Sequence, residues 1–508
     1  MNKINWKAAF DVLGYVLLFP AFFVLHGYNA FFGLLPVSIV GVLLLKYFAI
    51  SIFLFALAAL LFKRLPAVFV YSICLLSGYF FFGALHDGLK FLFPNSIITS
   101  YSILLPLLVL FSAALYIYLK RSKRSFLRLT RYIRILLLLF VGAEIVVFLY
   151  SGLSGKASEN NLAASTQWQA EPIDDRSKPD IFFIVFDEYP SSKSLRSDFQ
   201  FSNDALDSAL NNAGFFVSYD SKSNYNFTSY SLASTFSFNY LRVAPQTVLH
   251  EKQLLQSIQT LRKNPLTRFL ANQGYDVINY GTYELEQDAV KTVAYFDESF
   301  FKRVIDEQTL WSRIKRDIWW NVSVKDIRTG KLKIPDDFRQ QKALEVHRNQ
   351  YNYQHTIAQI DTTTTRPRFV FSHLLIPHAP YFLDANGKPL SDSAVFFRQF
   401  KEEEAFIEQV KYANKLLLNL VNHIKSQKTN RPRVYIIEGD HGYRYFDQYK
   451  DGTSAFSNLN AYYFSDQDYT LLYDGISPVN TFRVVLNKYF NAGLPTLKDS
   501  SVYVIDPR

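Results

Sequence analysis

The sequence predicts a helical membrane domain followed by an α/β sandwich with a mostly parallel β-sheet. Long apolar runs fill residues 1–150, and a polar stretch covers 151–178. Short apolar runs then alternate with helical patterns through the rest of the chain. Long apolar runs are typical of transmembrane helices, whereas strands that alternate with helices are typical of an α/β fold. We therefore expect a transmembrane domain over 1–150, a linker over 151–178 and a globular domain over 179–508.

Five apolar segments are each long enough to cross a membrane as a helix. They cover about 9–27, 37–62, 66–86, 100–119 and 133–150. A hydrocarbon core about 30 Å thick requires about 20 helical residues. Core helices of a soluble domain explain five such segments in succession poorly. The first segment lacks a small-residue cleavage site and four more follow it, so we do not interpret it as a signal peptide.

Basic residues set the expected orientation of these spans. The link between the fourth and fifth spans and the start of the fifth carry Lys120, Arg121, Lys123, Arg124, Arg128, Arg131 and Arg134. Because cytoplasmic loops are rich in Lys and Arg, we expect a cytoplasmic N-terminus in a bacterial-type cytoplasmic membrane. The globular domain is then extracytoplasmic. This link supplies much of the formal net charge of +10, so the charge indicates contact with anionic lipid rather than nucleic acid.

The cysteine content and the charges within the spans argue against two further functions, cysteine chemistry and transport. The only cysteine, Cys74, falls in the third predicted span, so the globular domain has neither disulfides nor cysteine chemistry. Away from their ends, the predicted spans carry two charged residues, Lys46 and Glu144. They give little sign of a polar path across the membrane, which argues against transport.

Strands and helices alternate in the globular domain. Apolar runs predict strands at 181–186, 275–280, 368–375, 434–438 and 458–464, and helical patterns cover 202–214, 255–272, 398–427 and 477–486. A helix is also expected after the hydroxyl-rich segment at 224–236. Residues 296–360, rich in charge and tryptophan, interrupt the alternation. We interpret them as a helical insertion that lies over the site or faces the membrane.

Metal-binding side chains follow two of the predicted strands. Asp187 and Glu188 follow the first strand, and Asp440 and His441 follow the strand at 434–438. Parallel α/β sheets place their ligands beyond the carboxyl ends of the strands, so these side chains can meet around one divalent cation. The alternative is that each polar pair simply begins a solvated loop.

The hydroxyl-rich segment offers a candidate nucleophile. Thr228 stands where the following helix is expected to begin. Backbone N–H groups at a helix N-terminus favour an incoming anion, and a metal that lowers the pKa of a hydroxyl creates a nucleophile. The alternative is that Thr228 only caps the helix.

Two histidines and one arginine are candidates for substrate contact. His373 lies within the strand 368–375, and His378 lies in the proline-bounded loop after it. An imidazole at either position can donate to a phosphoryl oxygen or protonate a leaving group. His373 is equally explained as a core histidine bonded to backbone, whereas we favour a functional role for His378. Arg444 can neutralise a phosphate or be an ordinary surface arginine.

Together these segments resemble the alkaline-phosphatase/sulfatase superfamily over about residues 178–490. The matching elements are Phe186-Asp187, the hydroxyl-led helix from Thr228, the loop Pro377-His378-Ala379-Pro380 and Asp440-His441-Gly442. The membrane-anchored lipoteichoic acid synthases and phosphoethanolamine transferases of this superfamily are similar in architecture. They also have five N-terminal spans before an external catalytic domain.

The resemblance implies a set of roles for these residues. Asp187, Thr228, Asp440 and His441 would bind one divalent metal ion. Thr228 would also be the nucleophile, and His378 would contact the substrate. The histidine ligand favours Zn²⁺ or Mn²⁺, with Mg²⁺ and Ca²⁺ as alternatives.

Two departures from the superfamily narrow the expected chemistry. The sequence around Thr228 lacks the Cys/Ser-x-Pro-Ser-Arg motif of sulfatases, which argues against sulfate-ester hydrolysis. No histidine follows His441, which favours one metal ion over two. Glu188 stands where sulfatases often have a second acidic ligand, and its role is left open.

We therefore expect a phosphotransferase acting through a phosphothreonine intermediate. The donor would be a membrane phospholipid with a phosphoglycerol or phosphoethanolamine head group, and the acceptor an extracytoplasmic glycan or lipid. Nucleic acid is not an expected partner. One alternative is a hydrolase of phosphate or sulfate esters with the same metal site. Another is a non-catalytic envelope protein with a structural metal site.

Overall fold

The chain divides into two compact units. The computed structural model describes residues 6–94, 96–153, 161–163, 174–286, 290–292, 299–319, 326–327, 329, 331, 333–397, 402–427, 431–444 and 453–505. The membrane unit comprises Met1–Asn160 with Asp297–Lys333, and the α/β unit comprises Asn161–Phe296 with Ile334–Arg508. The insertion predicted over 296–360 is thus divided between the two units.

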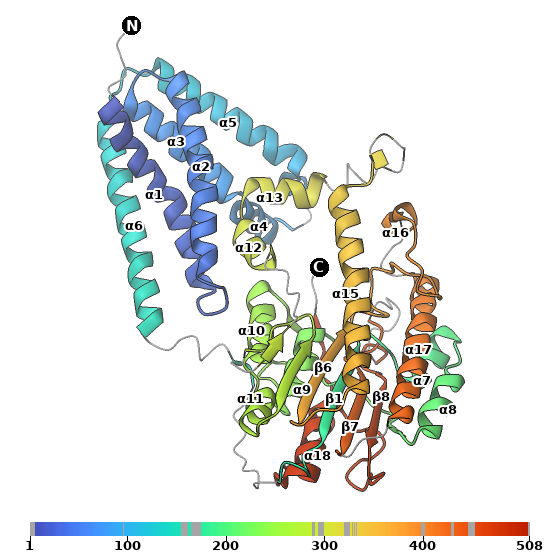
Figure 1. Cartoon of the computed structure of the whole chain (residues 1–508). Coiled ribbons are helices and arrows are strands. Elements are labelled where there is room, and N and C mark those ends of the chain that lie inside the picture. Colours follow the sequence, from blue (N-terminus) through green and yellow to red (C-terminus); the bar gives the residue numbers. More distant parts are fainter. Residues whose placement is uncertain are drawn as a thin grey trace. The chain divides into compact units, whose positions relative to one another are not determined.

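Six helices form the body of the membrane unit (Figure 1). They are α1 (Trp6–Ala30), α2 (Ser38–Leu61), α3 (Leu65–Phe80), α4 (Phe82–Leu92), α5 (Tyr101–Arg121) and α6 (Leu127–Leu153), with the 3₁₀ turn η1 (Ile97–Thr99) before α5. Four of them are long and apolar enough to span a membrane, and α3 with α4 makes a fifth if the bent pair counts as one span. The predicted apolar helices are therefore confirmed.

The third predicted span differs from a single straight helix. α3 and α4 bend by 59° at their junction. Just after this break, the Gly83 N–H donates to the carbonyl of Gln308, at 2.9 Å, rather than to a carbonyl of α3. Gln308 belongs to a short helical segment made of α12 (Ser299–Asp306), α13 (Leu310–Ile314) and the π-helical turn η3 (Lys315–Trp319). This segment, yellow in Figure 1, packs on α1, α2, α3 and α4.

The α/β unit is built around a seven-stranded sheet in the order β2-β8-β7-β1-β6-β4-β5. Its strands are β1 (Asp180–Phe186), β2 (Phe216–Val217), β4 (Asp276–Tyr280), β5 (Val290–Thr292), β6 (Arg368–Leu374), β7 (Arg433–Gly439) and β8 (Asn460–Phe464). β1 runs parallel to β6 and β7, and β4 runs parallel to β5 and β6. β8 is antiparallel to both β7 and β2. This mostly parallel sheet confirms the predicted fold class. β3 (Thr247–Val248) and β9 (Val504–Ile505) pair separately.

Helices cover both faces of the sheet (Figure 1). One face packs on α9 (Thr228–Ser237), α10 (Glu251–Arg262), α11 (Pro265–Asn272) and α18 (Pro478–Phe490). The other packs on α7 (Ser192–Phe199), α8 (Asp204–Asn212), α15 (Asp336–Asp361) and α17 (Glu403–Ser426), and α16 (Asp392–Phe397) contributes Val395 to the same core. Adjacent residues of β1 enter opposite cores: Phe183 packs on the first face and Phe182 on the second. Such two-sided burial explains why the central strands are continuously apolar.

Two predicted helices have different limits in the structure. The helix expected over 255–272 is split into α10 and α11, because the Asn264 side chain accepts the N–H of Thr267 and Pro265 begins a new first turn. The helix expected over 398–427 begins at Glu403 as α17. Residues 398–401 lie outside the described part of the chain.

Arginines gather at the amino ends of the central strands. Arg368 and Asp180 form an ion pair with 3.3 Å between Nε and Oδ2, and both side chains are at most 3% exposed. The Arg433 guanidinium donates to the Ile360 carbonyl at 2.7 Å and to the Tyr435 hydroxyl at 2.9 Å. These contacts satisfy carbonyls that the C-terminus of α15 would otherwise leave without partners.

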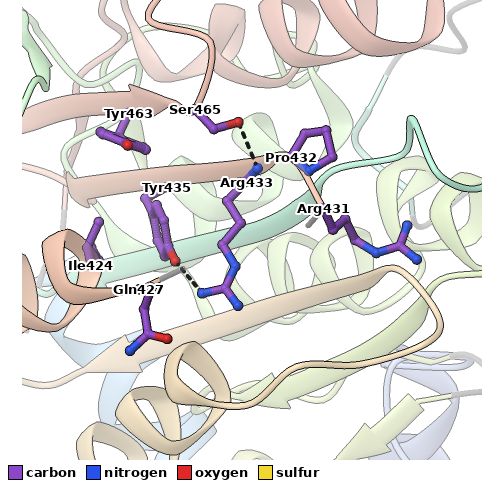
Figure 2. Close-up of a pocket in the computed structure, with 8 residues that line it drawn as sticks. All are labelled: Ile424, Gln427, Arg431, Pro432, Arg433, Tyr435, Tyr463 and Ser465. Atoms are coloured by element: carbon purple, nitrogen blue, oxygen red, sulfur yellow. Dashed lines mark hydrogen bonds between the residues drawn. The ribbon is translucent and has the colours of Figure 1, made fainter. Parts of the chain in front are cut away.

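A pocket of about 320 Å³ opens beside these arginines (Figure 2). It is lined by Ile424, Gln427, Arg431, Pro432, Arg433, Tyr435, Tyr463 and Ser465. Figure 2 shows Arg433 bonded to both Tyr435 and Ser465. Arg433 is the first residue of β7, so the pocket lies at the strand end opposite Asp440. Arg433 holds the end of α15, whereas Arg431 donates to the Thr365 carbonyl at 2.8 Å.

The buried pair at the amino end of β1 predicts a large stability effect. Asp180→Ala leaves Arg368 buried without a carboxylate, so we expect a loss of about 3–5 kcal/mol in the free energy of unfolding. The measurement is denaturant unfolding of the purified full chain in detergent. Asp204→Ala is the control, because Asp204 pairs with Arg196 at an exposed position and should cost about 1 kcal/mol or less. Equal losses in the two variants would contradict the prediction.

Candidate active site

The carboxyl ends of β1 and β7 bring three potential metal ligands together. The register pairs Phe186 with Gly439, so the two strands end at the same level. Asp187 follows β1, whereas Asp440 and His441 follow β7. One ligand atom from each of these three side chains lies within 4.8 Å of the others, and all three residues are buried. The structure thus places these sequence-predicted residues in one cluster.

Backbone N–H groups orient the Asp440 carboxylate. Its Oδ1 accepts from the N–H of Glu188 at 2.9 Å and from the N–H of His441 at 3.0 Å. Its Oδ2 is buried and has no hydrogen-bond partner among the described residues. One oxygen is therefore fixed by the fold, and the other is left to face the cluster.

The His441 imidazole is held in one tautomer. Its Nδ1 lies 2.8 Å from the carbonyl oxygen of Gly442. A carbonyl only accepts, so Nδ1 carries the proton and Nε2 presents a lone pair. Nε2 lies 3.6 Å from Asp440 Oδ2 and 3.9 Å from Asp187 Oδ1. A backbone carbonyl that accepts from one ring nitrogen leaves the other oriented and available to bind a metal.

Close backbone contacts explain the glycines on either side of this pair. A Cβ at Gly439 would lie 2.1 Å from the carbonyl oxygen of Tyr189, and one at Gly442 would lie 2.1 Å from that of Ser454. Neither position has room for a side chain without a shift of the backbone. The glycines therefore let the loop after β7 pack directly against its neighbours.

Thr228 joins the cluster from the N-terminus of α9. Its Oγ1 lies 3.3 Å from His441 Nε2, and the residue is 9% exposed. The N-cap position belongs to Phe227, and no side chain makes a cap hydrogen bond there. The alternative in which Thr228 only caps the helix is therefore not what the structure shows. Ser231, one turn later, donates to the Asp440 carbonyl at 2.6 Å and fixes α9 against the loop.

His373 contacts Asp187 from within β6. It is 1% exposed, and its Nε2 lies 3.2 Å from Asp187 Oδ2. Burial acts to lower the pKa of His373, but contact with the Asp187 carboxylate outweighs it and raises the pKa. Burial likewise acts to raise the pKa of Asp187, and the nearby histidines, His378 first, outweigh it and lower the pKa. The carboxylate is therefore ionised inside the protein.

His378 and Arg444 lie together beside the cluster. Arg444 Nη2 is 3.1 Å from His378 Nε2, and the guanidinium lies over the Phe227 ring at 5.0 Å. Glu188 accepts the N–H of Arg444 at 3.3 Å through Oε1. Burial raises the pKa of Glu188, although the charges of His378 and Arg444 oppose this. The structure thus brings a cation and an imidazole to the cluster of Asp187, Asp440 and His441.

The donor set fits a divalent cation. Asp187 Oδ1 and Asp440 Oδ2 are both buried without hydrogen-bond partners among the described residues. Buried carboxylate oxygens are costly to leave unpaired, and a cation between them would satisfy both. The nearby imidazole Nε2 and threonine hydroxyl add further N and O donors. The buried acidic and histidine cluster therefore has the donor chemistry of a metal site.

Some residues that support the site could not be identified from the sequence. Asn349 and Asn352 of α15 hold the end of β6: Asn349 accepts the N–H of Leu375 at 2.7 Å, and Asn352 donates to the His373 carbonyl at 3.2 Å. Nothing in the sequence marks them, because their partners lie on a different element. The positive φ of 62° at Glu188, rare for a residue with a side chain, was also not foreseeable.

A family model places the chain in a family, and several solved structures are similar to it. A family model described as Sulfatase matches residues 179–482. The comparison with curated proteins found no match. Among solved structures, the C-terminal periplasmic domain of EcEptC from Escherichia coli is similar at 12% identity and a TM-score of 0.36, with 66% of this chain and 86% of that chain covered.

Two further solved structures are similar to the chain. One is the integral membrane protein lipooligosaccharide phosphoethanolamine transferase A (EptA) from Neisseria meningitidis, at 10% identity and a TM-score of 0.36, with 94% of this chain and 95% of that one covered. The other is the C-terminal periplasmic domain of phosphoethanolamine transferase EptC from Campylobacter jejuni, at 13% identity and a TM-score of 0.36, with 62% and 90% covered.

The family assignment rests on the family model, which covers more than half of the chain. It includes β1, α9 and β7 and so contains every residue of the cluster. The predicted superfamily is thereby confirmed. The chain belongs to the sulfatase family and is an integral membrane enzyme of the alkaline-phosphatase/sulfatase superfamily that acts on phosphate or sulfate esters.

Proposed function

We propose that the protein is a metal-dependent phosphotransferase that moves a phospholipid head group, of the phosphoethanolamine or phosphoglycerol type, to an extracytoplasmic glycan or lipid. The observation that carries this proposal is the position of the Thr228 hydroxyl. It lies 3.3 Å from His441 Nε2 at the start of α9, beside the clustered carboxylates. A hydroxyl held there is suited to attack phosphorus rather than to serve the helix.

Asp187, Thr228, Asp440 and His441 would hold the metal ion. A bound divalent ion would lower the pKa of the coordinated hydroxyl and offset negative charge on phosphoryl oxygens. The donors are oxygen and imidazole nitrogen, without thiolate. The histidine favours Zn²⁺ or Mn²⁺, and Mg²⁺ and Ca²⁺ are the alternatives.

The proposed transfer has two displacement steps at phosphorus. In the first, Thr228 Oγ1 forms a bond to phosphorus, and the bond from phosphorus to the oxygen of diacylglycerol breaks. Diacylglycerol leaves with a proton, and the head group stays on Thr228 as a phosphodiester. In the second, an acceptor hydroxyl attacks phosphorus, the bond to Thr228 breaks, and the threonine hydroxyl regains its proton.

His378 and Arg444 would serve the phosphate and the proton transfers. Arg444 lies between Glu188 and Phe227, so its charge is held at the edge of the cluster. A phosphoryl oxygen that binds this guanidinium would compete with the contact between Arg444 and His378 Nε2. His378 Nε2 would then be available to take or give the proton. The buried His373 would hold Asp187 and not contact substrate.

A hydrolase is the second candidate, because the sulfatase family acts on esters through the same kind of site. The difference is the second step, in which water replaces the acceptor hydroxyl. Thr228 argues against formylglycine-dependent sulfate hydrolysis, because that chemistry starts from Cys or Ser. A phosphoester hydrolase would share the first step with the transferase.

The proposed orientation puts the N-terminus in the cytoplasm and the α/β unit outside. Two observations support it. The basic residues between α5 and α6 follow the positive-inside pattern. Residues 299–319, which interrupt the α/β sequence, pack at the end of the helices where α1 finishes and α2 begins, and the basic link is at the other end.

Removal of the Thr228 hydroxyl tests the proposed nucleophile. Thr228→Ala should lower head-group release from phospholipid vesicles by at least about 10³-fold, because the reacting oxygen is lost. Mass spectrometry of the wild-type protein should detect the head-group phosphate on Thr228. Thr235→Ala removes another buried hydroxyl of α9, which bonds Ser231 O, and should retain activity. Unchanged release by Thr228→Ala would refute the proposal.

Metal loss should be visible as a change in stability. A chelator should lower the melting temperature of the purified chain, and added Zn²⁺ or Mn²⁺ at 100 times its Kd should restore about 2.7 kcal/mol. Asp440→Asn and His441→Ala should abolish this response. His423→Ala is the matched control, because His423 pairs with Asp361 on the helices α17 and α15. A response that survives in both site variants would place the metal elsewhere.

An acceptor assay separates transfer from hydrolysis. With labelled donor lipid in membranes, the transferase should move the label to a second glycan or lipid, whereas a hydrolase should release it as a free phosphomonoester of the head group. Both reactions require Thr228 as the nucleophile, so the Thr228→Ala protein is the negative control for both. Release of free label alone, with every acceptor fraction unlabelled, would favour the hydrolase.

A further inference from the structure

Residues 299–319 interrupt the α/β sequence between β5 and α15, yet they pack on the helices of the membrane unit. We propose that these residues, here called the docking segment, form a second membrane anchor. The segment would bind the extracytoplasmic end of the helices and the lipid head groups around it. The proposal stands apart from the proposed chemistry, because it uses none of the site residues.

A partly buried carboxylate fixes the first part of the docking segment. Asp306, at the end of α12, pairs with Lys46 Nζ at 2.5 Å and accepts the Tyr47 hydroxyl. Its side chain is 17% exposed. A lysine inside a membrane helix is costly unless it is paired. Among the described residues, Lys46 has its ion-pair partner in this segment. Lys46, the charged residue within the second predicted span, is thus part of the docking contact.

An arginine fixes the second part of the docking segment. Arg313 of α13 donates to Asp87 of α4 through both terminal nitrogens, at 2.7 and 2.5 Å. Its Nε donates to the Glu307 carbonyl at 2.8 Å, and its side chain is 6% exposed. Two parallel bonds to one carboxylate fix the orientation of the guanidinium as well as its position. The Tyr101 hydroxyl of α5 adds a contact with Asp317.

Glycines let the docking segment approach the helices closely. A Cβ at Gly27 of α1 would lie 3.0 Å from Ile305 Cγ2, and one at Gly83 would lie 2.8 Å from Gln308 Cα. The Gly83 N–H also donates to the Gln308 carbonyl at 2.9 Å. Small residues at such positions are typical of tight packing between membrane helices. The contact is therefore a packed interface with both apolar and charged parts.

The exposed side of the segment fits a lipid interface. Trp311 and Trp319 are each 61% exposed, on a segment packed at the ends of apolar helices. Tryptophan is enriched at membrane–water interfaces, where its ring meets apolar chains and its N–H meets polar groups. Lys315 and Arg316 lie between these two tryptophans. Arg316 pairs with Asp317 at 2.6 Å, and the exposed Lys315 can pair with a lipid phosphate.

The docking segment changes how the α/β unit is held. The chain passes between the two units three times, once through the linker and once at each end of the segment. After the segment, the chain continues into α15, whose Asn349 and Asn352 hold the end of β6 beside the site. The linker is therefore not the only tether that keeps the α/β unit at the membrane.

Cleavage of the linker tests the second anchor. A protease site placed within residues 164–170 of the full chain allows cleavage in isolated membranes. The α/β fragment should remain in the membrane pellet after a high-salt wash. In Asp306→Ala/Arg313→Ala the released fraction should rise several-fold, because the docking pairs are lost. Asp204→Ala, which removes an exposed pair of the α/β unit, should behave like wild type. Release of the wild-type fragment, or full retention of the double variant, would overturn the proposal.

A designed disulfide tests the contact between the docking segment and α1 directly. Unlike the alanine variants, it does not remove an ion pair. In a Cys74→Ala background, Gly27→Cys and Ile305→Cys would place their Cβ atoms 3.6 Å apart, which suits a disulfide. After linker cleavage, the two fragments should migrate together without reductant and separately with it. Gly14→Cys with Ile305→Cys is the control, because no atom lies within 4 Å of a Cβ at Gly14. Equal cross-linking in both pairs, or none, would overturn the contact.

Brominated lipids test the lipid side of the proposal. A chain that retains only Trp311 among its tryptophans should lose about half or more of its emission when vesicle lipids carry bromine near the head group, as an interfacial ring would. A chain that retains only Trp168, in the linker, is the comparison. Equal, weak quenching of both would show that the docking segment does not meet lipid.

Discussion

The site depends on the carboxylate of Asp440, which connects the ends of two parallel strands. Its Oδ1 accepts one N–H from the turn after β1 and one from its own loop after β7. These bonds direct Oδ2 at the cluster and set the distance between Asp187 and His441. Ser231 adds the first turn of α9 through the Asp440 carbonyl. A single residue therefore places the ligands from both strands and the threonine hydroxyl.

The two ends of the central strands have opposite electrostatic roles. Carboxylates and imidazoles meet at the carboxyl ends, with oxygen atoms left open for a cation. Arginines gather at the amino ends, where Arg368 and Arg433 satisfy the carbonyls of α15 and the buried Asp180. The arginine end stabilises the sheet and the helix that crosses it. The carboxylates at the other end can bind a cation, because the arginine end supplies the stability of the sheet.

Support for the site extends outward through α15. Its asparagines hold the end of β6, and β6 supplies the buried His373 that faces Asp187. The same helix follows a segment that packs on the membrane helices through Asp306 and Arg313. The order of these elements along the chain connects the membrane unit to the residues behind the cluster. Such a tether would keep the site near the bilayer, where the proposed lipid donor would lie.

The sequence by itself determined the elements and the main site residues. Apolar runs located the membrane helices and the central strands, because continuous burial on both faces leaves a continuous apolar pattern. Asp187 and Asp440 were identifiable because each follows such a run. Only the tertiary structure decided that His373 faces Asp187, that Asn349 and Asn352 support β6, and that Lys46 pairs with Asp306. Those contacts join residues far apart in the chain, and local patterns record how a residue is buried but not which distant residue it meets.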